Sequence, residues 1–84
     1  MKKIAYSNQA RKALFRMAAD DSRRIRAKIE QYAAQPASLA NNVKVLKGES
    51  GYYRLRVGDW RVIFREDGVV LFVTRIAARG SAYD

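Results

Sequence analysis

The sequence predicts an α+β domain in which a short N-terminal strand and a helical hairpin pack on an antiparallel β-meander. Three observations support this fold class. Two segments near the N-terminus repeat apolar residues with helical spacing, and the second half of the chain alternates apolar and basic residues with strand spacing. Two glycine-containing pairs divide that second half into hairpins. The chain has 84 residues, so we expect a single domain over residues 1–84.

The composition excludes several kinds of site. Cysteine and histidine are both missing, which rules out a disulfide framework, a thiolate nucleophile and the commonest metal ligands. No apolar run reaches membrane-spanning length, and the N-terminus lacks the apolar region of a secretory signal. We therefore expect a cytoplasmic protein without a cofactor or metal. The formal charge of +9 favours nucleic acid or an acidic protein as the partner.

The first half of the chain predicts a strand and two helices. Residues 4–6 form the strand, and Ser7 follows as the N-cap of the first helix. Asp20 or Asp21 caps the second helix, which ends before Pro36 because the residue before a proline avoids helical geometry. Apolar side chains at intervals of four and three residues form the buried stripes, which are Ala10, Leu14 and Met17, then Ile25, Ile29 and Tyr32.

Residues 52–66 predict a β-hairpin, because apolar and basic residues alternate on both sides of the Gly58-Asp59 pair. With this pair as the turn, Arg56 lies opposite Arg61. The core face is then Tyr53, Leu55, Val57, Trp60, Val62 and Phe64, and the other face carries Arg54, Arg56 and Arg61. Directly opposed like charges destabilise a strand pair, so we expect this face to hold an anion.

The neighbouring segments complete the predicted sheet. Residues 43–46 form a short strand within a loop. A second glycine-containing pair, at residues 67–68, predicts a two-residue turn that leads into a buried strand over residues 69–76. In this register Arg61 lies opposite Thr74, and the polar face continues across three strands.

The main candidate site is a cluster of arginines made by Arg54, Arg56, Arg61 and Arg79. Guanidinium groups bind phosphate oxygens bidentately and stabilise the charge that develops in phosphate chemistry. The alternative is a solvated sheet face with scattered arginines. Tyr83 is placed to stack on an unpaired base, and the alternative for it is ordinary packing. We also expect RNA contacts from Lys44, Lys47 and Arg65. For the basic helix residues, a solvent-exposed face is the leading explanation.

The segments LKGESGYYRLRVGDWRVIF and RIAARGSAY resemble the RelE/ParE superfamily of bacterial toxins from type II toxin–antitoxin modules. The resemblance covers nearly the whole chain and favours the RelE-like branch. It implies a metal-independent endoribonuclease that cuts mRNA in the ribosomal A site and thereby inhibits translation. The cut would occur by attack of a 2′-hydroxyl on the adjacent phosphate. A separate, acidic antitoxin is the implied protein partner, beside the ribosome and mRNA.

The resemblance also assigns roles to residues. The two basic positions of the family on the first hairpin strand correspond to Arg54 and Arg56, and its phosphate-binding arginine corresponds to Arg61. Its C-terminal arginine, proposed as the general acid, corresponds to Arg79, and its base-stacking tyrosine to Tyr83.

Two departures from the family pattern keep other functions open. RelE carries lysines where this chain has Arg54 and Arg56, and an arginine does not release its proton. If Arg56 replaces the proposed base, proton removal falls to Glu49, a tyrosinate, water or the ribosome. The histidine that several relatives place before the C-terminal arginine is Ala78 here. The alternatives are a ParE-like toxin that inhibits DNA gyrase by binding, without RNA cleavage, and a basic binding module without toxicity.

Overall fold

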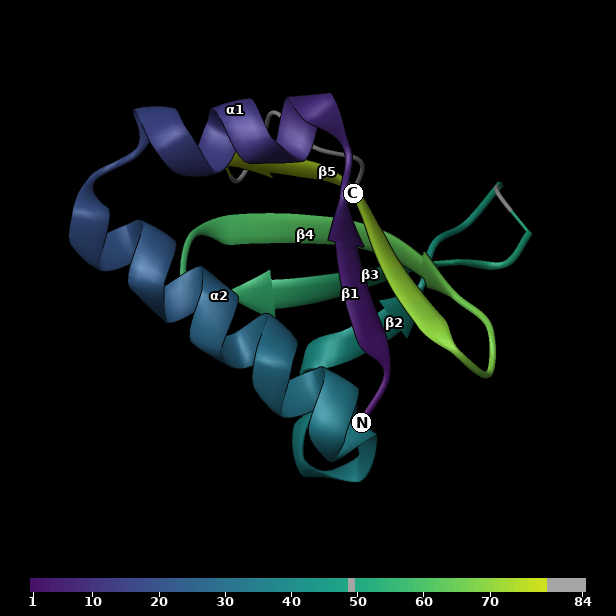
Figure 1. The fold of residues 1–84 in the computed structure, drawn as a ribbon. Helices are drawn as coiled ribbons and strands as arrows, with labels where there is room; N and C mark the ends of the chain where they lie inside the picture. The colour runs from purple at the N-terminus through teal and green to yellow at the C-terminus, as the bar shows by residue number, and fades with distance from the viewer. Residues whose placement is uncertain (49, 79–84) are drawn as a thin grey trace.

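The computed structural model describes residues 1–48 and 50–78, which fold into two layers (Figure 1). In chain order the elements are β1 (Lys3–Tyr6), α1 (Asn8–Arg16), α2 (Ala19–Ala34), the 3₁₀ segment η1 (Pro36–Asn42), β2 (Val43–Val45), β3 (Tyr52–Val57), β4 (Trp60–Glu66) and β5 (Val70–Ala78). The strand order is β1-β5-β4-β3-β2. All neighbours are antiparallel except β1 and β5, which run parallel. The predicted α+β class is confirmed, and η1 is an element that the sequence pattern did not predict.

Both helices pack on one face of the sheet through the predicted apolar stripes. The buried side chains of this core include Leu14, Ile25 and Ile29 from the helices and Leu55, Val57, Val62, Phe64, Leu71, Val73 and Ile76 from the strands. The Phe64 ring lies at the centre, with its centroid 5.1 Å from that of Tyr32 and 5.6 Å from that of Tyr53. Trp60 and Met17 are partly buried against this cluster, so the predicted core face is confirmed.

The predicted N-cap residue is correct for α1 and wrong for α2. Ser7 caps α1 as predicted, because its hydroxyl accepts a hydrogen bond from the Ala10 N–H at 3.0 Å. The N-cap of α2 is Ala18, without a side-chain hydrogen bond, and Asp20 and Asp21 lie inside the first turn. The prediction of an aspartate cap is therefore wrong. The two carboxylates still favour the positive end of the helix dipole. In Figure 1 the two helices diverge from their short connection.

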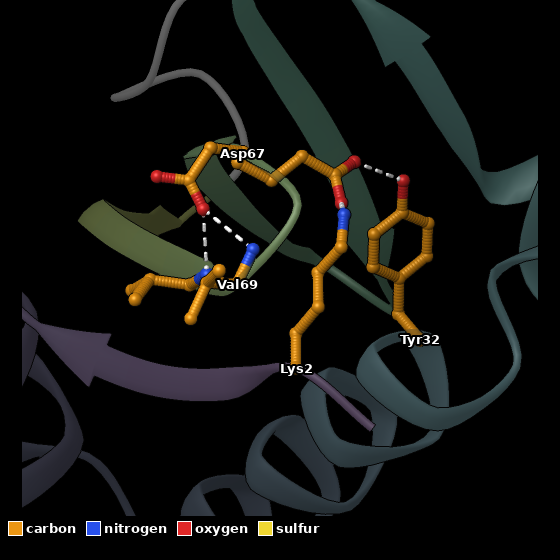
Figure 2. A network of polar contacts seen from close by, with 6 residues as sticks. Lys2, Tyr32, Asp67 and Val69 are labelled. Atoms are coloured by element: carbon orange, nitrogen blue, oxygen red, sulfur yellow. Dashed lines mark hydrogen bonds and ion pairs between the residues drawn. The ribbon is translucent and has the colours of Figure 1, made fainter.

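The connection between β4 and β5 is longer than predicted. Glu66 pairs with Leu71, so four residues separate the two members of this last pair instead of two. One oxygen of the Asp67 carboxylate accepts hydrogen bonds from the N–H groups of Val69 and Val70, both at 2.7 Å (Figure 2). These backbone donors hold the pKa of Asp67 below its usual value. The side chain of Asp67 thus closes a wider loop than a two-residue turn.

A bulge further along the same ladder shifts the register again. Thr74 is the extra residue of β5, and its hydroxyl donates a hydrogen bond to the Ile63 carbonyl at 3.1 Å. Arg61 consequently lies opposite Ala77, and the predicted pairing with Thr74 is wrong. The same shift places Arg75 opposite Ile63. The bulge therefore puts Ala77 in the place predicted for Thr74 and adds Arg75 to the polar face, next to Ile63.

Glu66 connects three distant parts of the chain at one end of the sheet. Its carboxylate accepts a hydrogen bond from the Tyr32 hydroxyl at 2.7 Å and forms an ion pair with the Lys2 ammonium (Figure 2). Burial, together with the hydrogen bond to Glu66, raises the pKa of Tyr32 above its ordinary value. This contact fixes the C-terminal end of α2 and the start of the chain to the end of β4.

We predict that Tyr32→Phe lowers the free energy of unfolding by about 1–3 kcal/mol near neutral pH, since it removes a hydrogen bond to a charged group. The raised pKa means that folded Tyr32 keeps its proton where the unfolded chain loses it, above about pH 10. The advantage of the wild type should be complete below that pH and should shrink as the pH rises further. Urea titrations at about pH 8 and about pH 11 measure this, and an equal difference at both would contradict it.

Candidate functional site

The sheet face opposite the helices is basic. Side chains alternate between the two faces of a strand, so residues that interleave with the core positions point away from it. We call these residues the basic sheet face: Lys44 on β2, Arg54 and Arg56 on β3, Arg61 and Arg65 on β4, and Arg75 on β5. Helix packing covers the other face. Besides these six cations on β2 to β5, Lys3 on β1 alternates with the core-facing Ile4 and Tyr6, so each of the five strands carries a cation on this face.

The strand register arranges these cations in rows. One row across β2 to β5 is Lys44, Arg54, Ile63 and Arg75, and the next row across β3 to β5 is Arg56, Arg61 and Ala77. Arg56 lies directly opposite Arg61, as the hairpin turn predicted. Neighbouring strands are about 4.8 Å apart, so long arginine side chains from adjacent strands reach the same volume.

Arg61 is the most deeply placed of these cations. Only 7% of its surface is exposed, because β4 lies in the middle of the sheet with β3 and β5 on either side. The Nη1 atom of Arg61 and the Nε atom of Arg75 are shielded from solvent. A shielded guanidinium keeps its charge, and its attraction to an anion is stronger than in bulk water. Arg56 is exposed and Arg54 is half-buried. An anion that approaches Arg61 therefore passes these two more accessible guanidinium groups.

A small hollow adjoins this cluster at the β2 edge. It is lined by Asn41 and Asn42 together with Lys44, Arg54 and Arg56. The two asparagines end η1, which places them beside the cations of β2 and β3. Amide and guanidinium donors in one hollow suit the oxygens of a phosphate or a ribose. In the sequence the asparagines indicate only a loop, so their place at the site was missed.

Several predicted site residues lie outside these two rows of cations. Lys47 is exposed in the connection between β2 and β3, and Arg65 lies at the far end of β4. Arg79, Tyr83 and Glu49 fall outside the described residues.

Within residues 1–48 and 50–78, the acidic side chains do not form a group that could hold a metal ion. None of the helices in that same part of the chain is long and apolar enough to cross a membrane.

The Arg56/Arg61 pair leads to a prediction about stability. Replacing Arg56 by glutamine should raise the free energy of unfolding by about 0.2–1 kcal/mol at low salt, because it removes a like charge opposite Arg61. Arg56→Lys keeps the charge and is the matched control. Added salt screens the repulsion, so the gain should shrink at high ionic strength. Denaturant titrations in low and high salt measure this, and equal stability of the two variants at low salt would refute it.

Comparison with known proteins identifies the family. Residues 4–83 match the model described as the ParE toxin of the type II toxin–antitoxin system parDE. Toxin RelE3 of Methanocaldococcus jannaschii is 37% identical over 46 residues, which are 55% of this chain and 52% of that protein. The match thus spans about half the length of that curated relative.

Solved structures show the same fold. The archaeal RelE–RelB complex from Pyrococcus horikoshii OT3 aligns with a TM-score of 0.78 and 26% identity, covering 96% of this chain and 98% of that chain. The RelB–RelE antitoxin–toxin complex from Methanococcus jannaschii aligns with a TM-score of 0.74 and 26% identity, covering 95% of each chain. The chain therefore belongs to the ParE toxin family of type II toxin–antitoxin systems, within the RelE/ParE superfamily.

Proposed function

We propose that this protein is a ribosome-dependent endoribonuclease that cleaves mRNA by attack of a ribose 2′-hydroxyl on the adjacent phosphate. The observation that carries the proposal is the basic sheet face, with Arg61 buried at the centre of its strands. The similarity to RelE toxins supports RNA, among the polyanions, as the substrate. Cleavage of mRNA on the ribosome would inhibit translation.

The arginines would act on the charge of the scissile phosphate. Attack of the 2′-oxygen forms a new bond to phosphorus, and the bond to the 5′-oxygen of the next nucleotide breaks. The products are a 2′,3′-cyclic phosphate and a free 5′-hydroxyl. Negative charge builds up on the phosphate oxygens on the way, and preorganised guanidinium donors stabilise it. Arg61 would hold this phosphate, with Arg54 and Arg56 beside it on β3.

Proton transfer would involve other groups, because Arg54 and Arg56 keep their protons. The proton of the 2′-hydroxyl would pass to water, a tyrosinate, Glu49 or the ribosome. By resemblance, Arg79 would donate the proton to the leaving 5′-oxygen, and Tyr83 would stack on a base. These assignments belong to the proposal, and the residues lie outside the described part of the chain.

The proposal includes a protein partner. Both structural relatives named above were solved with RelB, and the Methanococcus jannaschii structure is described as an antitoxin–toxin complex. A chain with a formal charge of +9 would bind an acidic antitoxin through its basic surfaces. Co-purification of this protein with the product of an adjacent gene would identify that partner.

The central test is an mRNA cleavage map after induced expression. We expect arrested translation with cuts at a fixed position within codons, and a rate about 10²–10³-fold lower for Arg61→Ala. Arg16→Ala is the matched control, because Arg16 is exposed on α1 and carries the same charge. Thermal unfolding checks that Arg61→Ala is folded. Intact mRNA in growth-arrested cells would overturn the proposal.

One observation favours a second function. The matching family model is that of the ParE toxin. In addition, this chain has Arg54 and Arg56 at the two positions where, by the resemblance, RelE has lysine. The alternative is therefore a ParE-like toxin that inhibits DNA gyrase by binding. A supercoiling assay with excess protein distinguishes the two, since inhibition of gyrase with intact mRNA would support this alternative.

A further inference from the structure

We propose that Phe72 and Arg65 form a stacking subsite for an unpaired base of single-stranded RNA. The pair lies on the basic sheet face, at the end away from the turn between β3 and β4. The inference rests on the proposed function and extends it, because it names where a nucleotide outside the cleavage position binds.

The pair is built by the register of β4 and β5. Arg65 lies opposite Phe72, and the guanidinium carbon of Arg65 is 5.3 Å from the centre of the Phe72 ring. Tyr52 lies on the other side of Arg65, on β3. Phe72 is half-buried and belongs neither to the described core cluster nor to the side chains packed against it. Arg65 is exposed. Bases stack on both aromatic rings and guanidinium planes, so this pair has the chemistry of a stacking platform.

A hollow of about 500 Å³ adjoins the pair. Its lining includes Ser50 and Gly51 from the β2–β3 connection, and Asp67 from the β4–β5 connection, beside Arg65 and Phe72. In Figure 1 both connections project from the same end of the sheet. The volume lies within the range of small-ligand sites and admits a nucleobase.

The charges of the hollow favour a base over a phosphate. One lining side chain is the cation Arg65, and two, Glu66 and Asp67, are carboxylates. The carboxylate of Glu66 is held by Lys2 and Tyr32, and one oxygen of Asp67 is held by backbone N–H groups. Because Lys2 compensates Glu66, and Arg65 lies beside Asp67, the hollow has no excess positive charge to hold a phosphate. A base can enter it and stack, while its phosphate stays on the cationic side of Arg65.

The subsite lies apart from the proposed cleavage position. Arg65 is four residues along β4 from Arg61, which corresponds to about 14 Å in a strand. A base on Phe72 therefore belongs to a different nucleotide from the one whose phosphate contacts Arg61. The platform would position the RNA strand along the sheet.

The test uses the full-length protein and a labelled 2′-O-methyl decaribonucleotide, which resists cleavage. Fluorescence anisotropy at low salt should show binding weakened about 5–100-fold by Phe72→Leu, and by less than about 2-fold by Phe72→Tyr, which keeps the ring. Phe15→Leu is the matched control, because Phe15 is 90% exposed on α1 and should leave affinity unchanged. Oligonucleotides with 2-aminopurine at successive positions should show quenching at one position, lost in Phe72→Leu.

The outcomes separate the subsite from the proposed function. Unchanged affinity and quenching in Phe72→Leu, with weaker binding in Arg61→Ala, would overturn the subsite alone. No salt-dependent binding by the wild type would also overturn the subsite, whereas the proposed function is decided separately by the mRNA cleavage map. If Phe72→Leu does not fold, Arg65→Lys tests the subsite instead, because Arg65 is exposed and its replacement should leave the fold intact. This variant keeps the charge and loses the guanidinium plane, so quenching should fall while the salt dependence of binding stays the same.

Discussion

The pairing of β3 with β4 is the constraint on which the rest of the structure depends. It places Leu55, Val62 and Phe64 under the helices, where each is at most 1% exposed. Burial of such a side chain stabilises the fold by about 1.5–3 kcal/mol. The same register sets Arg56 opposite Arg61, which costs about 0.2–1 kcal/mol. The hydrophobic gain exceeds the repulsion several times over, and a slip by one residue would expose the whole core face. Two opposed arginines are thus held together by packing on the other side of the sheet.

The basic residues form two surfaces, one on the helices and one on the sheet, and composition alone does not distinguish them. On α2, Arg23 and Arg24 pair with Asp20 and Asp21 one turn earlier, so part of that charge is compensated and exposed to solvent. On the sheet, Arg61 is 7% exposed and lies among further cations on neighbouring strands. Long-range attraction of RNA can come from either surface. Only the sheet face combines fixed geometry with a shielded guanidinium, which phosphate chemistry needs.

The parts of the fold that the sequence predicts are those with local causes. Alternation around Gly58, whose φ is +58°, is enough to define the β3–β4 register, and Ser7 is enough to start α1. The β4–β5 register depends on the hydrogen bonds of Asp67 to its own loop and on the bulge at Thr74, which no local pattern marks. For this reason Thr74 was placed on the basic face and Arg75 was missed. The roles of Arg79 and Tyr83 stay predictions.

The central claim is that the basic sheet face, and not the helix surface, neutralises RNA phosphates. The direct measurement is the salt dependence of binding to single-stranded RNA, because the slope of log K against log salt falls by about 0.7 for each phosphate that the protein no longer neutralises. The double variant Arg54→Gln/Arg56→Gln should reduce the slope by about 1.4. The matched double variant Arg11→Gln/Arg16→Gln on α1 should leave it unchanged. The reverse pattern would contradict the account.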